Sequence, residues 1–124
     1  MIFPASPEVV PDVRQRVREH LRLFGIDAAP AVELAVTEAV ANAALHAYPD
    51  DQPGEIEIVI SVAHNRVEAV IRDEGIGPQP NPQQQPGHYG VVLMEALADR
   101  FELEGAPGRG TTVRMEFVLP LARA

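Results

Sequence analysis

Two polar residues within one predicted helix have the types and the spacing for phosphoryl chemistry. Glu38 and Asn42 are four positions apart, so in a helix their side chains lie on one face, one turn from each other. A carboxylate can orient or deprotonate a hydroxyl group or a water, and an amide oxygen can provide one ligand to Mg²⁺, whose other ligands are usually waters and substrate phosphates. The same spacing also fits two solvated side chains on an exposed face, so the pair alone does not define a site.

A second candidate is the run Asp73-Glu74-Gly75-Ile76-Gly77, which we expect at the end of a strand. Because Gly75 and Gly77 carry no Cβ, a flat heterocycle could lie against the main chain there. The Asp73 carboxylate could accept a hydrogen bond from an adenine amino group, and a bond of that kind is worth about 1.5 to 3 kcal/mol. An ordinary turn after a strand is the alternative interpretation.

Two further positions could contact a nucleotide. All 10 basic residues of the chain are arginine, so no lysine is present to cradle phosphates in the manner of a P-loop. Gly90 opens a predicted helix whose unpaired backbone amides could bind phosphate oxygens instead. Thr112, which follows Gly110 and Thr111, could direct a hydroxyl toward the base, although a β-branched residue that opens a strand is equally typical.

The hydrophobic pattern predicts the elements that position these residues. The expected helices cover residues 6–24, 27–47 and 90–99, and the expected strands cover residues 55–62, 67–72, 100–104 and 111–119, with Ile2-Phe3 as a further edge strand. Apolar residues follow helical spacing in the first helix and alternate with polar ones in the strands. The second helix has an alanine at every fourth position from Ala35 to Ala47, which permits close packing. Residues 78–86, rich in Pro, Gln and Asn, resemble a mobile lid.

This order of elements predicts an α+β fold. We expect a two-layer α/β sandwich in which helices cover one face of a mixed, mostly antiparallel sheet. With 124 residues and 46% hydrophobic content, the chain fits a single domain over residues 1–124, because two domains of half that length would each be marginally stable.

The composition excludes several classes of function. A formal net charge of -8 disfavours direct binding of nucleic acid, which relies on clustered basic side chains, and is more compatible with a basic protein partner. The chain has 0 cysteines, so disulfides, thiol nucleophiles and thiolate metal sites are absent. No apolar run is long enough to span a bilayer, and the start of the chain does not have the pattern of a secretory signal. We therefore expect a cytoplasmic protein that does not bind membranes.

Several of these motifs, in this order, resemble those of bacterial anti-sigma-factor serine/threonine kinases. That family belongs to the GHKL superfamily of ATPases, which includes gyrase and sensor histidine kinases. The resemblance lies in EAVANAALHAY at residues 38–48, in DEGIG at residues 73–77 and in GTTVR at residues 110–114, and it extends from Phe3 to Phe117. It implies the Bergerat-type ATP-binding fold of the superfamily.

The resemblance also implies a role for each motif in binding ATP and Mg²⁺. Asn42 matches the metal ligand, which also contacts the nucleotide, and Glu38 matches the catalytic base. Asp73 matches the carboxylate that reads adenine, and Gly75 and Gly77 match the turn beside it.

Partners are implied by the same resemblance. Proteins of this family bind a sigma factor and block transcription. They also phosphorylate a serine or threonine of a small antagonist, the anti-anti-sigma protein, which then no longer removes them from the sigma factor. Members are commonly dimers, which makes a homodimer one expectation for this chain.

Two departures from the family pattern bear on catalysis. The family has Gly-x-Gly before the third helix where this chain has His88-Tyr89-Gly90, although Gly87 lies just upstream and stays a candidate for contact with phosphate. In the lid, residues 83–86 read QQQP where a basic side chain is often found, so the transferred phosphoryl group would be less well neutralised.

These departures keep an alternative function open. It is a non-catalytic, partner-switching module that binds a sigma factor and has a weak or vestigial nucleotide pocket. A third hypothesis, the ATP-binding half of a sensor histidine kinase, is weaker because we expect no room in the chain for a dimerisation helix with an acceptor histidine.

Overall fold

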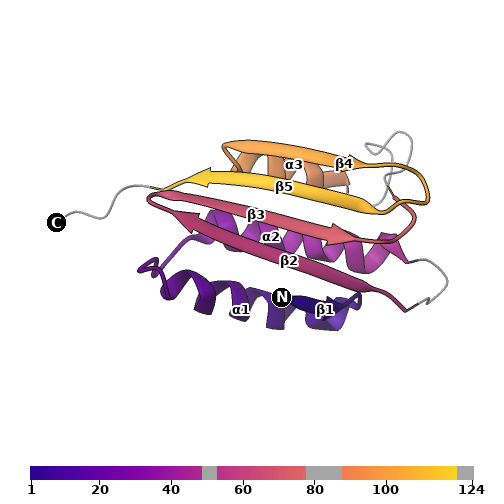
Figure 1. Cartoon of the computed structure of the whole chain (residues 1–124), viewed down its shortest axis with the longest axis horizontal. Coiled ribbons are helices and arrows are strands. Elements are labelled where there is room, and N and C mark those ends of the chain that lie inside the picture. The colour runs from indigo at the N-terminus through magenta and orange to yellow at the C-terminus, as the bar shows by residue number, and fades with distance from the viewer. Residues whose placement is uncertain (49–52, 78–87, 120–124) are drawn as a thin grey trace.

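The computed structural model describes residues 1–48, 53–77 and 88–119, which form one sheet with three α-helices on one of its faces (Figure 1). In chain order the elements are β1 (Ile2–Pro4), a 3-10 turn (Pro7–Val9), α1 (Val10–Arg22), α2 (Pro30–Asn42), a π-helical turn (Ala43–Ala47), β2 (Glu55–Ala63), β3 (Arg66–Asp73), α3 (His88–Leu97), β4 (Arg100–Gly105) and β5 (Thr111–Val118).

The strands of the described residues pair in the order β1-β2-β3-β5-β4, and each neighbouring pair is antiparallel. A two-residue turn at His64-Asn65 joins β2 to β3, since Ala63 pairs with Arg66. His64 has a φ of 56°, a left-handed conformation that such short turns require. β3 lies at the centre of the sheet, so its last residue, Asp73, has a neighbouring strand on each side.

Alternation along the strands separates a buried face from an exposed one. One side of each central strand is apolar and buried beneath the helices, while the residues between point to the opposite face. The buried set comprises Ile56, Ile58, Ile60, Val67, Ala69, Ile71, Val113, Met115 and Phe117.

The helices bury the apolar faces that their spacing predicts. In α1, Val13, Val17 and Leu21 are almost fully buried. The alanine series from Ala35 to Ala47 is buried as well, which confirms that this face of the second helix packs closely. α2 lies between α1 and α3 and also packs on β3.

The predicted two-layer α+β fold is confirmed, with some differences in detail. The paired strands are all antiparallel, so the described sheet is not mixed, and Ile2-Phe3 does belong to an edge strand. The second helix begins at Pro30 and changes to π geometry after Asn42, a change that fourfold spacing does not reveal. The expected lid, residues 78–86, lies outside the described residues.

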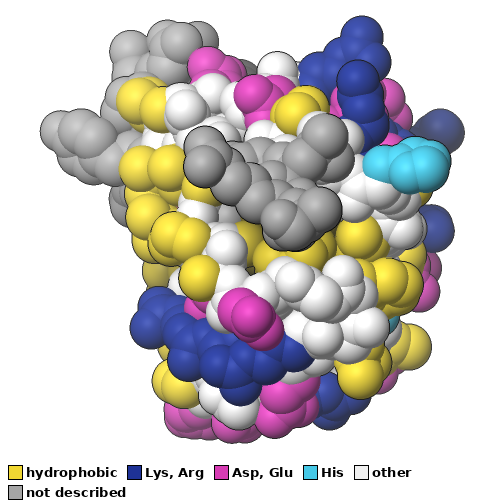
Figure 2. Space-filling model, turned by 90° about the vertical axis from the view of Figure 1, so that its left-hand side faces the viewer, with side chains coloured by type: hydrophobic (Ala, Val, Ile, Leu, Met, Phe, Trp, Pro, Cys, Tyr) yellow, Lys and Arg dark blue, Asp and Glu magenta, His cyan; other side chains and the backbone are white. Residues whose placement is uncertain are grey.

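The end of the molecule that carries the β2–β3 turn faces the viewer in Figure 2, where hydrophobic side chains form patches between charged ones. In the connection between α1 and α2, Leu23 and Phe24 are exposed to 81% and 53%. None of the described helices has both the length and the apolar character needed to cross a membrane.

Candidate functional site

Most of the candidate residues lie at the end of the sheet where α2 and β3 finish and α3 begins, on the right in Figure 1. α2 and β3 both run toward this end, so Glu38, Asn42 and Asp73 come near their carboxyl ends. α3 starts there and runs back, which places Gly90 in its first turn. The antiparallel course of these elements therefore gathers residues that are far apart in the sequence.

The structure brings Glu38, Asn42 and Gly90 together. A Cβ placed on Gly90 would lie 3.1 Å from Asn42 Nδ2 and 3.1 Å from Glu38 Oε2. Gly90 is buried and the two polar side chains are half-buried, so the pair is not a solvated surface feature. The carboxylate and the amide thus face the first turn of α3, which is the part of a helix that presents unpaired N–H groups to an anion.

Asp73 is buried on the helix-covered face of the sheet, with 7% of its surface exposed. Its Oδ1 accepts a hydrogen bond from Gly75 N–H at 2.9 Å. Burial raises the pKa of the Asp73 carboxyl, and the backbone N–H groups of Gly75 and Thr111 lower it in part. Because an ionised carboxylate has about four acceptor positions, Asp73 keeps capacity for a further donor such as an amino group.

The glycines after Asp73 are needed because backbone crowds them. A Cβ on Gly75 would collide with the carbonyl of Ala47, and a Cβ on Gly77, whose φ is 82°, would collide with the carbonyl of Ala106. Between them, Ile76 N–H donates to Ala47 C=O at 2.8 Å. The segment is therefore packed between the end of the second helix and the β4–β5 turn, a close-packing requirement that the sequence motif did not indicate.

The two threonines of β5 lie on opposite faces of the sheet. Asp73 pairs with Thr111, and Arg72 pairs with Thr112. Thr112 is therefore on the outer face with Arg72, whereas Thr111 is on the face of Asp73. The structure does not bring Thr112, which the sequence suggested, to the other candidates. The signal that could have selected Thr111 is its spacing of two residues from Val113, which belongs to the buried series.

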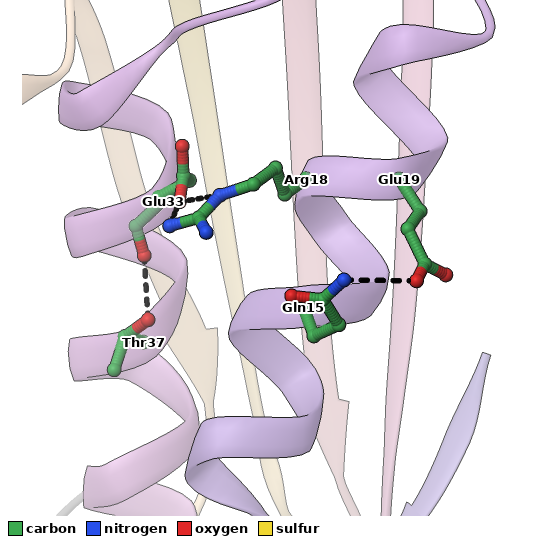
Figure 3. A network of polar contacts seen from close by, with 5 residues as sticks. All are labelled: Gln15, Arg18, Glu19, Glu33 and Thr37. Carbon is green, nitrogen blue, oxygen red and sulfur yellow. Dashed lines mark hydrogen bonds and ion pairs between the residues drawn. The ribbon is translucent and has the colours of Figure 1, made fainter.

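A polar network fixes α2 on the side away from α3 (Figure 3). Arg18 of α1 donates to Glu33 Oε1 of α2 through Nη2 at 2.7 Å and Nε at 3.0 Å. Thr37 Oγ1 donates to the carbonyl of Glu33 at 2.6 Å. The Arg18–Glu33 contact joins α2 to α1, so it helps to fix the rotation of α2 that turns Glu38 toward Gly90, whereas the Thr37 bond lies within α2.

Asn42 can provide one ligand to a metal ion whose other ligands come from the substrate and from water. It does not belong to a site in which protein side chains provide all the ligands. The described part of the chain holds no group of three or more His, Asp or Glu side chains able to coordinate a metal ion. One amide oxygen suits Mg²⁺, which takes most of its ligands from water and phosphate. Gly87, the other expected phosphate-loop glycine, lies outside the described residues.

A groove of about 580 Å³ opens beside Asp73. Its lining residues are Ile2, Tyr48, Pro53, Gly54, Glu55, Glu57, Arg72, Asp73 and Glu74. Glu38 and Asn42 are not part of this lining, and the groove includes the outer-face residues Glu57 and Arg72, so it is distinct from the space between α2 and α3.

Comparison with known proteins places the chain in a family. The family described as the histidine kinase-like ATPase domain matches residues 3–117. Serine-protein kinase RsbW of Bacillus subtilis (strain 168) is 31% identical over an alignment of 125 positions including gaps, and the alignment covers 87% of this chain and 78% of that protein. Anti-sigma F factor of Bacillus velezensis is 30% identical over an alignment of 110 positions, which covers 80% of this chain and 75% of that protein.

Solved structures share the fold. The histidine kinase domain of the Erythrobacter litoralis EL346 blue-light activated histidine kinase aligns with a TM-score of 0.60 at 23% identity, over 72% of this chain and 43% of that one. The mycobacterial sensor histidine kinase MprB aligns with a TM-score of 0.57 at 16% identity, over 98% and 99% of the two chains. Since the family match spans nearly the whole sequence and the fold agrees with it, the protein belongs to the histidine kinase-like ATPase domain family.

Proposed function

We propose that this chain is an anti-sigma-factor protein serine/threonine kinase. It binds ATP with Mg²⁺, sequesters a sigma factor and phosphorylates a serine or threonine of a small antagonist protein. The single observation that supports this most strongly is the approach of Gly90 to Glu38 and Asn42, because it joins an acid and an amide to the start of a helix. Relatives named serine-protein kinase and anti-sigma F factor support the same class of activity.

Asp73 is the proposed reader of the base. Its buried carboxylate accepts a hydrogen bond from Gly75 N–H and can accept another from the amino group of adenine. Gly75 lets the turn beside it approach Ala47 at the end of the second helix, and Gly77 lets it approach Ala106 in the β4–β5 turn. Thr111, which pairs with Asp73, takes the position on the base side that the sequence had suggested for Thr112.

Asn42 is the proposed protein ligand of Mg²⁺. When bound, Mg²⁺ neutralises charge on the triphosphate and orients it. The amides at the start of α3, with Gly90 and the preceding Gly87, are the proposed contacts to phosphate oxygens, which would compensate for the absence of lysine.

Glu38 is the proposed general base. In the transfer step, its carboxylate takes the proton of the acceptor hydroxyl as that oxygen forms a bond to the terminal phosphorus of ATP. The bond from that phosphorus to the bridging oxygen breaks, and ADP leaves. A carboxylate fits this role because Glu38 is half-buried and adjoins both Asn42 and the first turn of α3.

The direct experiment is incubation of the protein with terminally labelled ATP, Mg²⁺ and a candidate antagonist protein. We expect label on a serine or threonine of the antagonist. A complex with a sigma factor that forms without any transfer or ATP binding would contradict the kinase assignment. That result would support the alternative, a sigma-binding module with a vestigial pocket, for which the His88-Tyr89-Gly90 departure argues.

A further inference from the structure

The side chain of Tyr48 connects three segments at the edge of the candidate site. Its hydroxyl accepts a hydrogen bond from Glu74 N–H at 2.9 Å and donates one to the carbonyl of Glu55 at 2.8 Å. The ring lies so close to Gly54 that a Cβ there would collide with it. Because the hydroxyl is engaged both as acceptor and as donor, and Gly54 leaves room for the ring, Tyr48 is held in a single orientation.

The bond from Tyr48 completes a set of three that fixes the backbone after Asp73. The N–H groups of the next three residues each have a partner. Glu74 N–H donates to the hydroxyl of Tyr48. Gly75 N–H donates to the carboxylate of Asp73 itself, and Ile76 N–H donates to the carbonyl of Ala47. The orientation of the Asp73 carboxylate is thus coupled to the backbone that Tyr48 and Ala47 hold. Within this set of three bonds, Tyr48 supplies the one side-chain contact that does not come from Asp73.

We propose that Tyr48 is a positioning residue for base selection: by holding Glu74 N–H, it keeps the Asp73 carboxylate oriented to accept from an adenine amino group. The inference rests on the proposed function, in which Asp73 reads the base. Adenine presents an amino donor at the position where guanine presents a carbonyl acceptor. A fixed carboxylate therefore favours ATP and opposes GTP, whereas a carboxylate that can turn away loses part of this preference.

The first test compares Tyr48→Phe with wild type in Mg²⁺-nucleotide binding and in amide exchange. Phenylalanine keeps the ring but loses both hydrogen bonds. We expect faster hydrogen exchange at Glu74 N–H in the nucleotide-free protein. We also expect an ATP dissociation constant higher by about two- to tenfold, the range for loss of one ordinary hydrogen bond, with a smaller change for GTP. In steady-state phosphorylation the KM for ATP rises while kcat stays within about twofold.

A second variant disrupts the same contact without replacing the tyrosine. Gly54→Ala pushes the ring away, so it should lower the ATP-to-GTP preference as Tyr48→Phe does. The double variant should be no worse than either single one, because both remove the same interaction. Asp99→Ala is the matched control, since Asp99 Oδ2 accepts Val118 N–H at 2.6 Å and its loss also frees one backbone donor. We expect no change of nucleotide preference in that control.

The outcomes separate this inference from the proposed function. If wild type binds ATP but the two variants keep the wild-type preference for ATP over GTP, the positioning role is overturned and the proposed function stands. Unchanged exchange at Glu74 in Tyr48→Phe overturns it as well. If wild type binds neither nucleotide, both the proposed function and the inference are wrong.

Discussion

The backbone of Gly90 lies against the carboxylate of Glu38, since a Cβ on Gly90 would lie 3.1 Å from Glu38 Oε2. The first turn of α3 approaches α2 this closely because the residue at the contact has no side chain. The glycine thus sets the separation between the carboxylate and the helix start. Every role proposed for the pair Glu38 and Asn42 depends on that separation.

Replacement of Gly90 by alanine should separate activity from stability. Alanine favours a helix by about 1 kcal/mol relative to glycine, so we expect thermal stability to be unchanged or higher. The new methyl group must displace Glu38 or Asn42 by a few tenths of an ångström, and we expect phosphotransfer to fall about tenfold, equivalent to about 1.4 kcal/mol in the barrier. Thermal unfolding and initial rates measured together would check this, and an unchanged rate would show that the separation is not critical.

Glu38→Gln should remove the base and leave nucleotide binding intact. Glutamine has nearly the same shape but cannot take a proton at neutral pH, so we expect phosphotransfer to fall by about 10²- to 10⁴-fold. The ATP dissociation constant should stay within about twofold. Glu95→Gln on the exposed face of α3 is the control and should behave as wild type. A Glu38→Gln protein with full transfer activity would exclude Glu38 as the base.

Two glycines of the β4–β5 turn offer a matched comparison. Gly108 and Gly110 both have a left-handed φ, 79° and 81°, but a Cβ on Gly108 meets nothing within 4 Å, whereas one on Gly110 would collide with the carbonyl of Asp73. We expect Gly108→Ala to cost about 1 kcal/mol from backbone strain. Gly110→Ala should cost about 3 kcal/mol or more and should also weaken ATP binding. Urea unfolding measures both, and equal losses would mean that the close approach to Asp73 is unimportant.

The raised pKa of the Asp73 carboxyl predicts how the effect of replacing Asp73 on stability changes with pH. Burial makes the folded protein hold this proton more tightly than the unfolded chain, where the ordinary pKa is 3.8. The contribution of Asp73 to stability is therefore full below pH 3.8 and declines as the pH rises through the folded pKa. The side-chain amide that Asp73→Asn introduces has no such proton to lose.

The free energy of unfolding of Asp73→Asn, relative to wild type, should consequently increase as the pH rises above 3.8, because wild type loses this contribution to stability and the variant does not. Urea unfolding of the nucleotide-free proteins at several pH values provides the measurement. A difference that is constant with pH, or that changes in the opposite direction, would show that burial does not dominate the pKa of the Asp73 carboxyl.

Local periodicity made much of the site predictable. Four-residue spacing put Glu38 and Asn42 on one helix face, and alternation ended a strand at Asp73, because both patterns depend only on neighbouring residues. That α2, β3 and α3 meet at one end of the sheet depends on the strand order and helix packing of the fold, which these local patterns do not set. The two-layer fold followed from the same patterns.

Other features depend on contacts between distant segments. The π-helical turn after Asn42 ends at Ala47, whose carbonyl accepts Ile76 N–H, and no local pattern predicts that partner. The choice between Thr111 and Thr112 depends on the register of β5 against β3, where one residue changes the face of the sheet. Tyr48 closes the EAVANAALHAY motif, but its role requires knowing that Glu74 lies beside it.

Calorimetric titration of Mg²⁺-ATP into wild type and Asp73→Asn tests the nucleotide site most directly. We expect wild type to bind ATP with a dissociation constant below about 1 mM and Asp73→Asn to bind about ten- to a hundredfold more weakly, in line with loss of a charge-assisted hydrogen bond. Absence of binding by the wild-type protein, or equal affinity in the two proteins, would contradict an adenine site at Asp73.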